Sequence, residues 1–156
     1  MSERNYSQST IDVIADIQLG IMVARAAEAL AGALTPIFNI IGGPVLMTGF
    51  FGYISVASGA NATHLEATPT TGTSIPICAD LDINPALVGD YLTITGIGSD
   101  AMTYNASLTG LPMFGGAKGV ILPVGTLDVH PAAADGTVAW TIFYVPLATG
   151  AYVTAT

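Results

Sequence analysis

His64 and Glu66 are the first candidates for chemistry, because a two-residue spacing places both side chains on one face of a strand. Asp80 and Asp82 share this spacing within the run Cys-Ala-Asp-Leu-Asp. Either pair could supply ligands to a metal ion. Such pairs are common in proteins without a metal, however, and the two aspartates also suit a turn that they cap before the Asn-Pro pair at position 84. We therefore predict a capped turn, with no metal site and no cofactor.

Nucleophilic catalysis would require a serine or cysteine beside a base, and His64 and His130 are the two histidines of the chain. Neither Ser74 nor Ser99 lies in the Gly-x-Ser-x-Gly pattern of a nucleophile elbow. His130 precedes a proline, and we expect it in a loop. The sequence therefore predicts a protein that is not an enzyme.

Three further motifs have structural interpretations. Cys78 is the single cysteine, which excludes an intrachain disulfide and a cysteine zinc site, and we expect a buried thiol. The glycine-rich run 115–119 lacks the Walker spacing and indicates a hairpin or loop. Sequons begin at Asn61 and Asn105, and the polar start of the chain does not resemble a secretory signal, so we interpret both as polar turns.

The elements that position these residues come from a chain that is poor in charge. Its 156 residues fit one domain with one core. Hydrophobic residues make up 51% and charged residues 9%, against about 25% charged residues in an ordinary soluble domain. The net charge is −8, and Arg4, Arg25 and Lys118 are scattered, which excludes nucleic acid as a partner. We expect a surface of small residues that is partly buried against neighbouring subunits.

The N-terminal part predicts a flexible segment over residues 1–8 and a long helix over residues 9–34. Ser9 or Thr10 can cap the helix, and Asp12 and Asp16 suit its positive end. Apolar residues then recur at spacings of three and four, as on a helix face. Pro36 and the Gly-Gly-Pro run that follows would end the helix.

Short apolar and β-branched runs replace the helical pattern from residue 45 onward. The expected fold is mainly β, an α+β arrangement in which the helix precedes an antiparallel β-sandwich or barrel-like region over residues 45–156. We expect residues 9–156 to form a single domain. Candidate strands cover residues 45–57, 62–67, 74–81, 91–97, 119–124, 138–145 and 151–154.

A membrane-anchored protein and a pilin-like filament subunit are the alternatives from other classes. Residues 29–63 carry no charged side chain, as a membrane span would require. Pro36, Asn39 and the Gly-Gly-Pro run interrupt this stretch, so we expect no membrane partner. A pilin also places a hydrophobic helix before a β domain, but it needs a basic leader and a continuous apolar helix start.

Four segments carry a resemblance to small virion proteins of tailed bacteriophages. They are Gly-Gly-Pro-Val-Leu-Met-Thr-Gly-Phe-Phe-Gly from Gly42, Cys-Ala-Asp-Leu-Asp-Ile from Cys78, Ile-Gly-Ser-Asp-Ala-Met from Ile97 and Trp-Thr-Ile-Phe-Tyr-Val-Pro-Leu from Trp140. The chain resembles head decoration, or cement, proteins over most of residues 9–155. The resemblance implies a structural subunit that is assembled in the bacterial cytoplasm, joins the virion and stabilises the shell of major capsid protein from outside. A tail or fibre subunit would look similar.

The predicted helix carries apolar residues on more faces than one small β domain can cover. We expect this helix to contact other copies of the chain or the capsid shell. A trimer is what the resemblance implies, because decoration proteins often occupy threefold positions. The expected interface residues are Ile14, Ile17, Ile21, Ala24, Ala27, Ala31 and Leu34.

Overall fold

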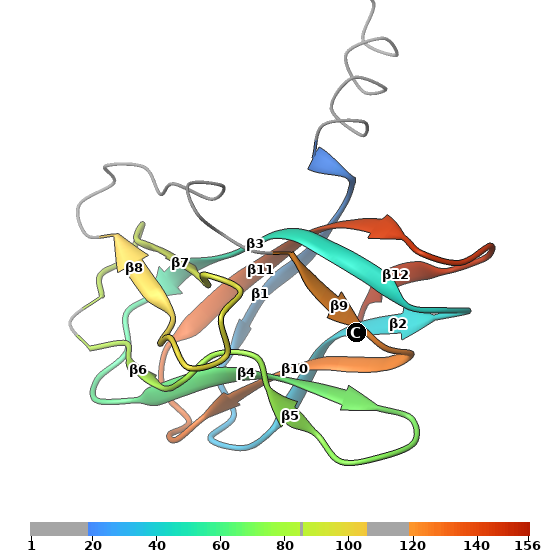
Figure 1. The fold of residues 1–156 in the computed structure, drawn as a ribbon. Coiled ribbons are helices and arrows are strands. Elements are labelled where there is room, and N and C mark those ends of the chain that lie inside the picture. The colour runs from blue at the N-terminus through green and yellow to red at the C-terminus, as the bar shows by residue number, and fades with distance from the viewer. Residues whose placement is uncertain (1–18, 85, 106–118) are drawn as a thin grey trace, which may run out of the picture.

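Two antiparallel sheets of six strands each pack face to face in the computed structural model, which describes residues 19–84, 86–105 and 119–156 (Figure 1). Burial alternates along the long strands, so every second side chain enters the layer between the sheets. The mainly β architecture and the sandwich-like arrangement predicted from the sequence are confirmed.

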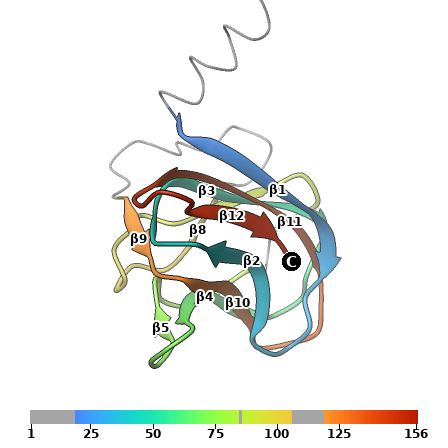
Figure 2. The ribbon, with the colours of Figure 1, turned by 90° about the vertical axis from the view of Figure 1, so that its right-hand side faces the viewer.

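Sheet A has the strand order β1-β11-β3-β7-β8, with β9 also paired to β3. Its centre is the long antiparallel pair of β3 and β11, and β1 is an edge strand along one margin of the sandwich (Figure 2). The strands are β1 (Ile21–Ala29), β3 (Val45–Val56), β7 (Tyr91–Thr93), β8 (Thr103–Asn105), β9 (Val120–Leu122) and β11 (Thr137–Pro146).

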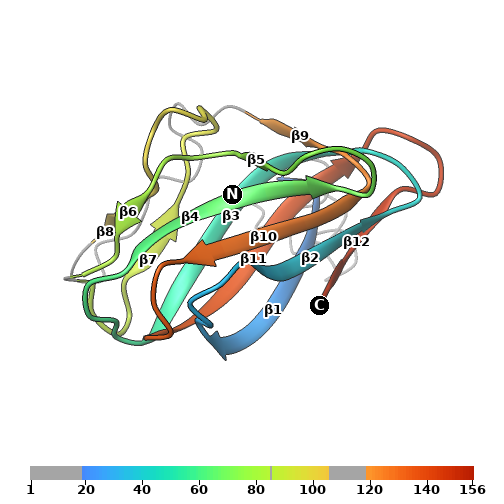
Figure 3. The same cartoon turned by 90° about the horizontal axis from the view of Figure 1, so that it is seen from below.

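Sheet B has the strand order β12-β2-β10-β4-β5, with β6 also paired to β4, and it faces the viewer in Figure 3. The pair of β4 and β10 keeps an unbroken register, in which His64 lies directly opposite His130 and Glu66 lies opposite Asp128. The strands are β2 (Thr35–Ile41), β4 (Ala62–Pro69), β5 (Ile75–Pro76), β6 (Leu81–Asp82), β10 (Gly125–Pro131) and β12 (Tyr152–Ala155).

Trp140 is the largest side chain of the core between the sheets. Its ring stacks on Phe50 with centroids 5.3 Å apart. The indole also covers Gly52, its cross-strand partner, where a Cβ atom would lie 2.5 Å from Trp140 Cζ3. The glycine in β3 is therefore what makes room for the tryptophan in β11.

The predicted long helix is wrong for the part of it that the structure describes. Residues 21–29 form β1, which pairs with β11, and β2 begins at Thr35; residues 9–18 lie outside the described residues. Alanine favours a helix by less than 1 kcal/mol per residue over most residue types. The hydrogen bonds and packing offered by the exposed edge of β11 outweigh that preference.

The predicted strands at residues 45–57, 62–67, 119–124, 138–145 and 151–154 are confirmed to within a few residues. The expected strand at 74–81 is divided into β5 and β6, and that at 91–97 is limited to β7. Four strands were not predicted as strands: β1, which the sequence assigned to the helix, and β2, β8 and β10.

Candidate functional site

The five predicted interface residues within the described part of the chain do not lie on a helix. Ile21, Ala24 and Ala27 belong to β1, and Ala31 and Leu34 belong to the turn between β1 and β2. All five are exposed. The other two, Ile14 and Ile17, lie outside the described residues.

The free edge of β1, where another strand could pair, carries a bulge and two charged side chains. A register shift interrupts the β1–β11 ladder between Arg25 and Glu28, whose side chains form an ion pair. Arg25 Nε also donates to the backbone and hydroxyl oxygens of Thr156, each 3.3 Å away. Bulges and charges of this kind discourage uncontrolled strand addition. The edge is therefore less suited to contact than the sheet face beside it.

The outer face of sheet A carries uncharged side chains, several of them apolar or aromatic. Arg25 and Glu28 are the only charged residues in the described strands of this sheet. The Phe51 ring contacts Phe143 and Tyr91, with centroids 6.4 Å and 5.9 Å apart. At its margins, Met22 is 58% exposed and Ile121 is 65% exposed. We call this surface the apolar face: Met22, Phe51, Tyr53, Tyr91, Ile121 and Phe143.

The outer face of sheet B carries a cluster of imidazoles and carboxylates. His64 and Glu66 project from β4 and His130 projects from β10, because the residues between them point into the core. His64 Nδ1 lies 2.7 Å from Asp80 Oδ1, and His64 Nε2 lies 3.0 Å from Glu66 Oε1. His130 Nδ1 lies 3.4 Å from the same Glu66 oxygen. We call these four residues the His-carboxylate cluster.

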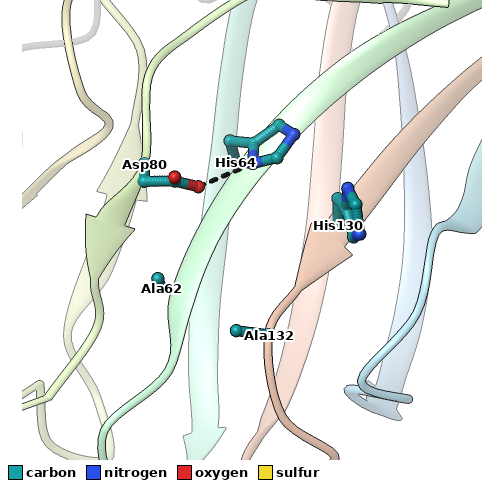
Figure 4. Close-up of a pocket in the computed structure, with 5 residues that line it drawn as sticks. All are labelled: Ala62, His64, Asp80, His130 and Ala132. Carbon is teal, nitrogen blue, oxygen red and sulfur yellow. Dashed lines mark hydrogen bonds and ion pairs between the residues drawn. The ribbon is translucent and has the colours of Figure 1, made fainter.

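Small residues leave space beside this cluster. Ala62 and Ala132 flank the imidazoles, and a pocket of about 210 Å³ is lined by these alanines with His64, Asp80 and His130. Figure 4 shows Asp80 and His130 on opposite sides of the His64 ring. Water or a small ligand can therefore reach the imidazoles.

The electrostatics of the cluster follow from these contacts. Burial disfavours the charged form of His64, but the hydrogen bonds to Glu66 and Asp80 outweigh it, so the pKa of His64 is raised above 6.5. The hydrogen bond from His64 lowers the pKa of Glu66 below 4.5. A protonated His64 can thus donate one hydrogen bond to Glu66 and one to Asp80.

The predictions for single residues have mixed outcomes. His64 and Glu66 do share a strand face. Asp82 does cap a turn, because its Oδ1 accepts hydrogen bonds from the backbone N–H groups of Asn61 and Asn84. The thiol of Cys78 is buried, and burial raises its pKa to about 11.

Other residues of the cluster differ from expectation. Asp80 contacts His64 and does not share the capping role of Asp82. The expectation that His130 lies in a loop is wrong, since it belongs to β10. The signal for β10 is the alternation of polar and apolar residues from Thr126 to His130, whose apolar members are both buried.

Comparisons with known proteins give no match for the chain. No protein family, no curated protein and no solved structure matches it. Within the described residues, the structure contains no helix with the length and apolar character needed to cross a membrane.

Proposed function

We propose that this chain is a non-enzymatic structural subunit of a virion, of the decoration type, which binds the outside of the major capsid shell and stabilises it. The observation that carries the proposal is the apolar face of sheet A. Exposed apolar and aromatic side chains that gather on a face without strand charges other than Arg25 and Glu28 are typical of a protein contact surface.

The composition of the chain supports a permanent contact over a transient one. Obligate interfaces are more hydrophobic than transient ones and resemble a divided core. Aromatic residues and methionine are the side chains enriched at interface centres, and the apolar face contains both. The virion setting comes from the sequence resemblance.

The partners under this proposal are other copies of the chain and the major capsid protein. We propose a trimer, which would place the same contact at several equivalent points and strengthen shell binding by multivalency. Ile21 and Ala24 lie on β1 with Met22 between them, so the predicted interface residues adjoin the apolar face. Leu34 and Ala31 would extend the contact past the end of β1.

Immunoelectron microscopy tests this proposal. Virus particles from cultures that express the gene are purified and labelled with an antibody raised against the chain. We expect label over the whole head surface, and detachment of the subunit should make the heads less resistant to heat. Label confined to tails or fibres would favour the alternative location within the virion, and label on cellular filaments would contradict the virion assignment.

A further inference from the structure

Three residues of the His-carboxylate cluster have ligand atoms with the spacing of a metal site. His64, Glu66 and His130 each offer one ligand atom, and these three atoms all lie within 4.8 Å of one another. Two of the separations, 3.0 Å and 3.4 Å, share Glu66 Oε1. Ligands at zinc distances of about 2.0–2.1 Å in a tetrahedron lie about 3.3 Å apart. Small side-chain shifts would thus bring all three atoms to one ion.

Asp80 supplies the carboxylate that orients a metal-binding histidine through its second ring nitrogen. Its Oδ1 lies 2.7 Å from His64 Nδ1, whereas Glu66 contacts the other ring nitrogen, Nε2. A carboxylate in this position holds the proton on Nδ1 and leaves the Nε2 lone pair free for a metal, as in carboxylate–histidine–zinc arrangements. The ring is therefore already oriented for binding through Nε2.

The charge around the cluster favours a cation. Asp128 lies opposite Glu66 on the same outer face and is 2% exposed. Its Oδ1 is buried with no hydrogen-bond partner in the part of the chain that the structure describes. With Glu66 and Asp80 this makes three carboxylates around two imidazoles. Two imidazoles carry at most two positive charges, so a divalent ion would offset negative charge that they leave unbalanced.

We propose that His64, Glu66 and His130 bind one divalent transition-metal ion, with zinc as the best fit to two nitrogens and one carboxylate oxygen. Three protein ligands leave one tetrahedral position for water, and the pocket beside Ala62 and Ala132 borders the same two imidazoles. On binding, the ion takes the place of the proton between His64 Nε2 and Glu66. It links β4 to β10 on the outer face of sheet B.

Zinc binding to chelator-treated, full-length protein tests the proposal by calorimetry and thermal unfolding. We expect one equivalent of zinc per chain at micromolar affinity or tighter, with a higher unfolding temperature. Millimolar magnesium or calcium should not compete, because these ions prefer all-oxygen ligand sets. Absence of zinc binding at micromolar zinc concentrations would overturn the proposal.

Variants assign the ligands. Glu66→Gln and His130→Ala each remove one ligand and should abolish micromolar binding, whereas Asp80→Asn should weaken it about 10- to 100-fold. Glu28→Gln removes an exposed carboxylate on sheet A and is the matched control, with unchanged affinity. Undiminished zinc binding by His130→Ala would contradict the site.

X-ray absorption at the zinc edge tests the site without any substitution. The chain contains two histidines, so a spectrum with two imidazoles per ion requires both His64 and His130. A spectrum with fewer imidazoles, or with sulfur from Cys78, would overturn the assignment even if a ligand variant failed to fold. Because the cluster is on sheet B, this result is independent of the virion proposal.

Discussion

Burial controls the chemistry of Cys78 at the scale of a single residue. The thiol is 1% exposed, and its Sγ accepts a hydrogen bond from the backbone N–H of Leu65, 3.3 Å away. Burial raises the pKa of this thiol to about 11, so the reactive thiolate is scarce near neutral pH.

We therefore expect native protein to be inert toward a thiol reagent such as dithiobis-nitrobenzoate at pH 8. One thiol per chain should react once a denaturant unfolds the sandwich. The absorbance of the released thionitrobenzoate measures both states. Rapid labelling of the native protein would show that β4 opens easily, because the thiol is held against that strand.

Asp82 provides a pH-dependent contribution at the same scale. Hydrogen bonds from the backbone N–H groups of Asn61 and Asn84 lower the pKa of this exposed carboxyl below 3.8. A lowered folded-state pKa gives stability that is present above the unfolded value and is lost as pH falls through the folded value. Asp82→Asn should thus be less stable than the parent at pH 6, and the difference should shrink as the pH falls from 3.8 through the lower folded-state pKa.

Urea unfolding of the parent and Asp82→Asn across this pH range measures the effect. Asp135→Asn is a useful comparison, because Asp135 also accepts a backbone hydrogen bond, from Gly59. A stability difference for Asp82→Asn that did not vary with pH would mean that the charge of Asp82 does not stabilise the turn.

The sequence predicted part of the His-carboxylate cluster and missed the rest. The shared face of His64 and Glu66 follows from strand alternation, which is a local property. The contacts with Asp80 and His130 depend on which strands become neighbours. That pairing joins residues 16 and 64 positions apart along the chain, which no local pattern specifies.

At the scale of the element, β1 shows why the helix prediction was wrong. Its sequence, Ile-Met-Val-Ala-Arg-Ala-Ala-Glu-Ala, has high helix propensity, and as an edge strand it is exposed at most positions. A strand with little burial has weak alternation, so its apolar residues fit a helical spacing equally well. In contrast, β3 and β11 bury alternate residues deeply, and both were predicted correctly.

The pairing of Gly52 with Trp140 allows a test of how β3 and β11 pack. Gly52→Ala would place a methyl group 2.5 Å from the indole and 2.9 Å from Val138 Cγ1. Overpacking of this kind costs about 1–3 kcal/mol of unfolding free energy. Chemical denaturation followed by Trp140 fluorescence measures the loss.

Gly98→Ala is the matched control for this substitution. A Cβ atom at Gly98 would meet only Pro76 O, at an ordinary 3.6 Å, so we expect a change within about 0.5 kcal/mol. If Gly52→Ala were equally neutral, the core around Trp140 would have to be loose enough to absorb a methyl group.

At the scale of the whole molecule, the two outer faces of the sandwich differ in chemistry. Sheet A presents the apolar face, whereas sheet B presents imidazoles and carboxylates beside a pocket. A subunit bound to its neighbours through sheet A would leave sheet B open to solvent. The proposed assembly contact and the proposed metal site are therefore compatible in one particle.

The last prediction concerns the assembly contact. Met22→Asp combined with Ile121→Asp places two charges at exposed positions of the apolar face, where neither side chain is needed for the core. An unpaired charge in an apolar contact costs several kcal/mol, so association should fail while the sandwich still folds. Light scattering coupled to size-exclusion chromatography should give a trimer mass for the parent and a monomer mass for the double variant, with unchanged circular dichroism.

Ile75→Asp is the control for the assembly prediction, because Ile75 is 64% exposed in a strand of sheet B, against 65% for Ile121 in sheet A. It carries the same change of side chain at nearly the same exposure, in the edge strand β5 of the other sheet, and should leave the trimer intact. If Ile75→Asp dissociated the oligomer and the sheet A variant did not, the contact would involve the β5 edge of sheet B and not the apolar face. A monomeric parent would contradict self-association and leave the capsid shell as the remaining partner for the apolar face.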